Sequence, residues 1–185
     1  MKKNFGVNPW LFPMPVLIIS AYDREGVPCA MNAAWGGMAG ENLIAMCVTP
    51  THKTILNARE RGAFTVAVGD VEHEVECDYV GVVSGNDVPD KFARAGFHAT
   101  KSEFVDAPVI DELKMSLDCE LLSYDEETHI MIGKIVNIQA DESVLDSDGN
   151  INPSKFRPIT FDPVNHKYIA LGEVVGDAFA DGNKL

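Results

Sequence analysis

The strongest constraint on the fold is an alternating stretch in the second half of the chain. From Leu113 to Leu121 every second residue is apolar, and the residues between them are charged or polar. A period of two predicts a half-buried strand. After a turn at residues 125–128 the apolar stretch Ile130–Ile138 follows, which predicts a long antiparallel hairpin. This half of the chain is therefore expected to form a sheet.

The first half of the chain adds more strands joined by short turns. We expect buried strands over Met14–Tyr22, Val27–Ala34, Leu43–Val48 and Ala63–Val68. The turn at residues 23–26 predicts that the first two of these strands form a hairpin. We expect short helices from the N-cap Thr51 to Gly62, from about Val71 to Tyr79, and around Pro89 up to Gly96. Many strands with few short helices favour a mainly β fold, a β-barrel with peripheral helices, over a doubly wound sheet.

Composition limits the class of protein and its partners. A chain of 185 residues with 46% hydrophobic content predicts one globular domain over residues 1–185. The net charge of −13 argues against nucleic acid or an anionic membrane as partner. No signal peptide or membrane span is recognised. The four cysteines lack metal-site spacing, and three of them lie in apolar or alternating runs that predict burial, so we expect a reduced, cytoplasmic protein.

The segment Thr49–Asn57 places cations where a helix is expected to begin. His52 and Lys53 follow the predicted N-cap Thr51, in the turn where acidic residues would suit the helix dipole. Threonine hydroxyls and free backbone N–H groups lie beside them. This combination predicts a phosphate site. A lysine that simply extends into solvent is the alternative.

Two other polar elements favour the same kind of ligand. Asn32–Gly37 combines an amide, small residues that allow close backbone approach, and the large ring of Trp35. Ser84 and Gly85 precede a short predicted helix in which Lys91 is a second early cation. Each element has an ordinary explanation, with Trp35 in the core and Lys91 on a solvated face. Together they favour a flat, phosphorylated ligand.

Several other sites are not supported by the sequence. There is no G-x-G-x-x-G, P-loop or H-E-x-x-H motif. The segment Asp146–Asn152 resembles a calcium loop, but its glycine falls at the fourth position and Arg157 stands where a bidentate glutamate is needed. We therefore expect an Asp-Gly turn there and no metal site.

Several motifs resemble those of the flavin reductase-like, FMN-binding split-barrel family, in its flavoredoxin branch. They are Asn32–Gly37, His52–Ile55, Ser84–Phe92, Ala107–Ile110, His129–Gly133 and Tyr168–Gly176. Each motif is weak by itself, but their order along the chain is specific. The resemblance implies a Greek-key split β-barrel, a homodimer with FMN near the subunit interface, and redox use of the flavin. A single phosphate site favours FMN over FAD.

The resemblance also assigns residues to the cofactor. Lys53, Thr54 and Lys91 are expected at the phosphate and ribityl chain, and Tyr168 near the flavin. The full set of expected cofactor-binding residues is Asn32, Ala33, Ala34, Trp35, Thr49, His52, Lys53, Thr54, Ser84, Lys91 and Tyr168. His129 is the candidate catalytic residue, approaching from the barrel or the partner subunit. A surface histidine at a hairpin turn is the alternative for His129.

The expected function is that of an FMN-dependent oxidoreductase. The flavin would accept electrons from NADH, NADPH or a protein donor and pass them to an unidentified acceptor. Because hydride transfer to a flavin requires alignment more than acid–base catalysis, the lack of a catalytic dyad does not argue against this. One alternative is a non-enzymatic electron-transfer protein with tightly bound FMN, whose acidic surface would dock a basic partner. Another is a flavin-binding or structural barrel without turnover.

Overall fold

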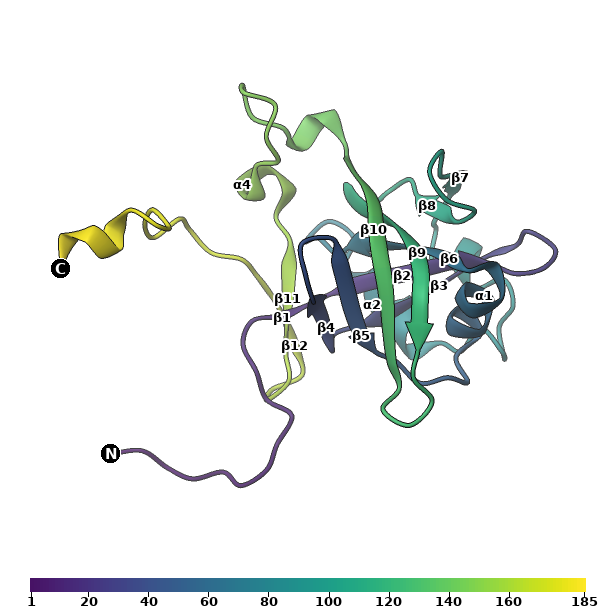
Figure 1. Ribbon diagram of the computed structural model, residues 1–185, viewed down its shortest axis with the longest axis horizontal. Helices are drawn as coiled ribbons and strands as arrows, with labels where there is room; N and C mark the ends of the chain where they lie inside the picture. The colour runs from purple at the N-terminus through teal and green to yellow at the C-terminus, as the bar shows by residue number, and fades with distance from the viewer.

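A seven-stranded antiparallel sheet, curled into a half-barrel, forms the body of the protein (Figure 1). The computed structural model describes all residues, 1–185. The strands are β1 (Met14–Pro15), β2 (Leu17–Tyr22), β3 (Pro28–Ala33), β4 (Gly36–Met38), β5 (Leu43–Cys47), β6 (Ala63–Val68), β7 (Ala99–Lys101), β8 (Pro108–Ile110), β9 (Met115–Tyr124), β10 (Ile130–Ala140), β11 (Ile159–Asp162) and β12 (Lys167–Ala170). The helices are α1 (Lys53–Arg61), α2 (Glu74–Val82), α3 (Lys91–Arg94) and α4 (Pro153–Phe156), with 3₁₀ turns at Glu142–Val144 and Asp181–Lys184.

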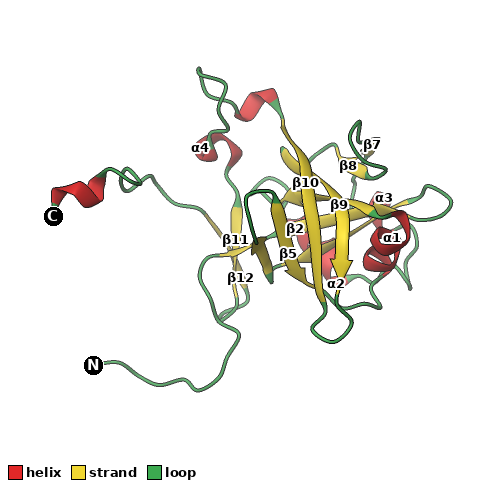
Figure 2. Ribbon diagram, viewed as in Figure 1, coloured by secondary structure: helices red, strands yellow, loops and turns green.

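The order of strands in the large sheet is β3-β2-β6-β9-β10-β5-β4. A smaller sheet, β1-β11-β12, and the β7–β8 hairpin lie beside it. Strands dominate and the helices lie at the periphery (Figure 2), which confirms the mainly β prediction. Both predicted hairpins are present, β2 with β3 and β9 with β10. The second contains two register shifts, after Ile132 and after Ile135.

Both faces of β2 are buried, which explains its uninterrupted apolar sequence. Leu17 and Ile19 pack inside the barrel in a cluster that includes Phe64. Ile18 points to the opposite face, into a cluster that includes Val80 of α2. The first cluster also contains Ile55 and Ala58 of α1, and the second holds α2 against the outside of the sheet.

The alternation in β9 predicted one solvent-exposed face, and this is wrong for its first half. Ser116 is 1% exposed and Asp118 is fully buried. The β7–β8 hairpin packs against the neighbouring strand β6, where the Thr65 hydroxyl donates to the Pro108 carbonyl oxygen at 2.5 Å. The Asp118 carboxylate accepts hydrogen bonds from the Gln139 amide at 3.0 Å and from that of Asn137 at 2.8 Å. Packing by the β7–β8 hairpin, which directly precedes β9 in the chain, thus turns a polar face into an interior one.

The predicted helices exist, with shifted starts. Helix α1 begins at Lys53 with His52 as its N-cap, so the prediction of Thr51 as the N-cap was wrong. It ends as expected at Gly62, whose left-handed backbone (φ 68°) suits glycine. Helix α2 starts and ends three residues later than predicted. The longest helices have nine residues each, and no helix has the length and apolar character needed to cross a membrane.

Two smaller predictions have mixed outcomes. Cys29, Cys77 and Cys119 are buried, whereas Cys47 is exposed although it lies in an apolar run. It lies on the face of β5 opposite to the buried Ile44 and Met46, because successive side chains of a strand alternate between its faces. The segment Asp146–Asn150 forms the expected turn, in which the Asp146 carboxylate accepts two backbone N–H groups.

Lys91 does not lie on the solvated face that its ordinary explanation requires. It is the first residue of α3, yet its side chain is 3% exposed and reaches the end of α2. Its ammonium donates to the carbonyl oxygens of Val80 at 3.0 Å and Val83 at 2.8 Å. A cation is favoured at a helix C-terminus, where the last carbonyls lack partners. Lys91 therefore caps α2, and this contact uses two of its three donors.

Replacing Lys91 with Met tests this capping role. The variant keeps the apolar stem but leaves two carbonyl groups without their charged donor. We expect the free energy of unfolding of the apo protein to fall by roughly 2–3 kcal/mol in urea denaturation. Lys101→Met is the control, because Lys101 is mostly exposed and pairs with Asp106 at the surface; its loss should cost less than about 1 kcal/mol. Equal effects would contradict the capping role.

Candidate functional site

Two adjoining cavities lie where β3, the start of α1, α2 and β12 meet. The first, which we call the aromatic cavity, has a volume of about 340 Å³ and is walled by Trp35, Phe161 and Tyr168. The second, which we call the basic cavity, has a volume of about 210 Å³ and is lined by Lys53 and Lys91. They share Met31, Asn32, His52, Gly81 and Val82. The two therefore form one continuous site.

All the predicted cofactor-binding residues line this site. Those in the aromatic cavity are Asn32, Ala33, Ala34, Trp35, Thr49, His52 and Tyr168. Those in the basic cavity are Asn32, His52, Lys53, Thr54, Ser84 and Lys91. Segments separated by more than a hundred residues in the sequence thus converge on one place.

The aromatic cavity has the shape and chemistry of a site for a flat ring. Trp35 is half exposed, so it is not the core residue that the alternative explanation required. The Phe161 ring centroid lies 6.3 Å from that of Trp35 and 6.1 Å from that of Tyr168. Aromatic walls with small residues between them allow a planar ligand to stack.

A chain of hydrogen bonds crosses the aromatic cavity. The Asn32 amide donates to the Cys77 carbonyl oxygen at 3.1 Å and to the Tyr168 hydroxyl oxygen at 3.4 Å. The Tyr168 hydroxyl in turn donates to Asp78 Oδ1 at 2.8 Å. Burial and the bond to Asp78 raise the pKa of Tyr168, so this hydroxyl stays protonated at neutral pH. The chain ties β3, α2 and β12 together.

His52 lies at the junction of the two cavities and stays neutral. Partial desolvation of its imidazole, aided by the positive charge of Lys91, lowers the pKa of His52. At neutral pH it is therefore an uncharged hydrogen-bonding group. It can orient a ligand at the junction without adding charge.

The basic cavity is suited to an anion. No protein acceptor is assigned to the backbone N–H groups of Lys53 and Thr54, at the start of α1. The Lys53 ammonium lies 3.7 Å from Asp23 Oδ2, and its side chain is 37% exposed. Unpartnered N–H groups, a helix dipole and a partly exposed ammonium are the groups with which proteins bind phosphate.

Three further residues shape the basic cavity. Thr54 is buried, and its hydroxyl donates to Cys29 Sγ at 3.2 Å. The Ser84 hydroxyl accepts the Asn86 N–H at 3.2 Å. Gly85 could not carry a side chain, because a Cβ would lie 2.9 Å from Cys29 Sγ and 3.2 Å from Lys53 Cβ. Burial also lowers the pKa of Lys91, which lines the same cavity.

His129 is the predicted site residue that the structure leaves outside both cavities. It is half-buried next to β10, in the left-handed backbone region (φ 58°). Its carbonyl oxygen accepts the Val48 N–H at 2.9 Å. Within this chain His129 has a structural position at the hairpin turn, and its catalytic role stays a prediction.

Asp78, Gly81 and Phe161 also line the aromatic cavity, and sequence reasoning did not identify them. Asp78 lies in the predicted helix from about Val71 to Tyr79, to which no site residue was assigned, and Phe161 lies in no predicted element. The only available signal was the proximity of Phe161 to the Tyr168–Gly176 motif. The pairing of β11 with β12, which places Phe161 opposite Tyr168, is visible only in the fold.

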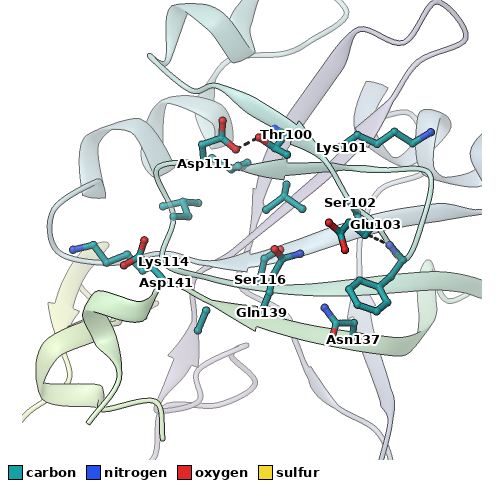
Figure 3. A pocket seen from close by; sticks show the side chains of 15 residues that line it. Thr100, Lys101, Ser102, Glu103, Asp111, Lys114, Ser116, Asn137, Gln139 and Asp141 are labelled. Atoms are coloured by element: carbon teal, nitrogen blue, oxygen red, sulfur yellow. Dashed lines mark hydrogen bonds between the residues drawn. The ribbon is translucent and has the colours of Figure 1, made fainter. Parts of the chain in front are cut away.

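A larger cavity of about 490 Å³ lies between the β7–β8 hairpin and strands β9 and β10 (Figure 3). Its two lysines are already paired, Lys101 with Asp106 at 2.9 Å and Lys114 with Glu72 at 2.7 Å. It contains a single aromatic residue and none of the predicted site residues. Its chemistry suits a flavin phosphate less well than the continuous site does.

Comparison with known proteins identifies the fold. Flavoredoxin of Desulfovibrio vulgaris (Miyazaki F) superposes with a TM-score of 0.94 at 35% identity, over 98% of this chain and 100% of that one. Flavoredoxin from Methanosarcina acetivorans has the same fold, with a TM-score of 0.88 at 24% identity over 99% of each chain. The predicted Greek-key split barrel is therefore confirmed.

Sequence comparison adds one family and two shorter matches. An uncharacterized protein from Aquifex aeolicus is 34% identical over 83 residues, and one from Aeropyrum pernix is 27% identical over 118 residues. The chain spans less than half the length of these relatives, 42% and 44%. The model of the flavin reductase like domain matches residues 10–160. The chain belongs to the flavin reductase-like family.

Proposed function

We propose that this protein is an FMN-binding oxidoreductase of the flavoredoxin type. The observation that carries the proposal is the continuity of the aromatic and basic cavities, which together contain every residue expected to contact FMN. The aromatic cavity accepts the isoalloxazine ring. The basic cavity accepts the phosphate. FMN, which needs both, matches the site better than a neutral ring or a simple anion.

The protein's own groups bind and orient the cofactor. Trp35 and Phe161 provide apolar surface for the ring. Lys53 and the two free N–H groups at the start of α1 supply positive charge and donors for the phosphate. Asn32 and the neutral His52 lie where the two cavities join. The bound flavin supplies the electron chemistry, and the residues around it control access and alignment.

Electrons reach the flavin from NADH, NADPH or a protein donor and leave to an acceptor still to be identified. The open side of the aromatic cavity, where Trp35 is half exposed, gives a donor access to the ring. The net charge of −13 favours the second candidate, an electron-transfer protein that docks a basic partner. We place either function in the cytoplasm, because all four thiols are unpaired.

The experiment that tests this function is an anaerobic titration of the FMN-loaded protein. We expect visible flavin absorption, bleached by NADH or NADPH at a rate well above that of free FMN. Bleaching by dithionite but not by either nicotinamide would favour the electron-transfer protein. Absence of FMN binding would refute both candidates.

Lys53→Ala tests the phosphate assignment. Losing a charge-assisted contact should weaken FMN binding about ten- to a hundredfold, equivalent to roughly 1.5–3 kcal/mol, in a fluorescence titration. Riboflavin, which lacks the phosphate, should bind the variant as it binds the wild type. The apo protein should change in stability by less than about 1 kcal/mol, because the Asp23 pair is partly exposed.

Lys134→Ala is the matched control for this measurement. Lys134 also lies 3.7 Å from its carboxylate partner, Glu120, and its replacement removes the same charge far from the site. We expect no change in FMN affinity. Unchanged FMN affinity in Lys53→Ala would place the phosphate elsewhere.

We also propose a homodimer. The segments before β1 and after β12 extend away from the body (Figure 1) and expose large apolar side chains. Phe5, Leu11, Val175 and Phe179 are each more than 60% exposed. Such surfaces are expected to pack against a second copy. Sedimentation equilibrium should give twice the chain mass of 20.2 kDa, and a 20.2 kDa monomer that still binds FMN would contradict the dimer.

A further inference from the structure

The aromatic cavity contains one carboxylate that the cofactor assignment leaves unused. Asp78, on α2, lines this cavity, and its Oδ1 accepts a hydrogen bond from the Tyr168 hydroxyl at 2.8 Å. Asp78 takes part in no ion pair. Its only side-chain partner is therefore a neutral hydroxyl. Asp78 is thus a half-buried carboxylate with no basic side chain paired to it.

The surroundings of Asp78 do not neutralise this charge. No lysine or arginine lines the aromatic cavity. His52 is neutral at neutral pH, because desolvation lowers the pKa of its imidazole. The cations of the site, Lys53 and Lys91, lie in the basic cavity. The site is thus divided into a positive end for the phosphate and a negative end for the ring.

Asp78 is also held in place. The Tyr168 hydroxyl that donates to it is itself 3.4 Å from the Asn32 amide, and this amide donates to the Cys77 carbonyl oxygen on α2. Helix α2 packs so closely on β3 that a Cβ on Gly81 would lie 2.9 Å from Asn32 Cβ. The carboxylate therefore cannot easily turn away from the cavity.

We propose that Asp78 lowers the redox potential of the flavin bound in the aromatic cavity. The inference rests on the proposed FMN binding. A fixed negative charge beside the ring disfavours the uptake of electrons and so makes the reduced flavin a stronger donor. Reduction by a nicotinamide moves a hydride, which carries two electrons and one proton, from the donor to the flavin. Asp78 takes no part in this transfer and acts through its charge.

The test is the midpoint potential of bound FMN, measured by anaerobic spectroelectrochemistry. Asp78→Asn removes the charge and keeps the size of the side chain. It should favour the reduced over the oxidised flavin about tenfold, which corresponds to a rise of about 30 mV for a two-electron couple. Asp78→Ser, a second neutral variant, should give a rise of the same sign. The midpoint potential depends on the ratio of the affinities for oxidised and reduced FMN. A variant that binds both forms more weakly by the same factor therefore keeps the wild-type potential.

Two controls separate charge from structure. Glu76→Gln removes the same charge from α2, two residues away and outside the cavity lining, and should leave the potential unchanged. Tyr168→Phe keeps the charge of Asp78 but removes its hydrogen-bond donor, and should not raise the potential. If Tyr168→Phe raises the potential as much as Asp78→Asn does, Asp78 acts only by positioning Tyr168 and the proposal fails.

The outcomes also separate this inference from the proposed function. If the wild type binds no FMN, both are overturned. If the wild type binds FMN but the neutral Asp78 variants have the same midpoint potential as the Glu76→Gln control, only this inference is overturned. A raised potential in both neutral variants, with both controls at or below wild type, supports it.

Discussion

The close packing of α2 against β3 is the contact on which the site depends. Gly81 has no side chain, so the helix approaches the strand closely enough for Asn32 to reach the Cys77 carbonyl oxygen. The same amide contacts Tyr168, which brings β12 to the cavity. Lys91 caps the far end of the helix. The aromatic walls and the basic end keep their relative positions because one helix is fixed at several points.

An acidic protein can hold an anionic cofactor because the binding charges are local. The net charge of −13 would repel a phosphate at long range. At the start of α1, free N–H groups, the helix dipole and Lys53 act at contact distance, where they outweigh the screened overall charge. In the second proposed function, the acidic surface that remains would dock a basic electron-transfer partner.

Much of the fold follows from local patterns, whereas the use of particular side chains does not. Periodicity located the β2–β3 and β9–β10 hairpins because pairing of neighbouring strands is encoded nearby in sequence. It failed at Ser116 and Asp118, which the β7–β8 hairpin covers, because the periodicity of a strand does not reveal what packs on its polar face. The ordered motifs contain the residues that line the two adjoining cavities, but no motif predicted that Lys91 also donates to the end of another helix. No sequence pattern marked Asp78 as a site residue, because only the fold places α2 beside β12.

The most direct test of this account is a crystal structure of the protein with bound FMN. We predict the isoalloxazine ring against Trp35, Phe161 and Tyr168, and the phosphate at the backbone N–H groups of Lys53 and Thr54. This arrangement would confirm that the two cavities form one flavin site. A phosphate located away from the start of α1, or a flavin in the cavity beside β7 and β8, would contradict it.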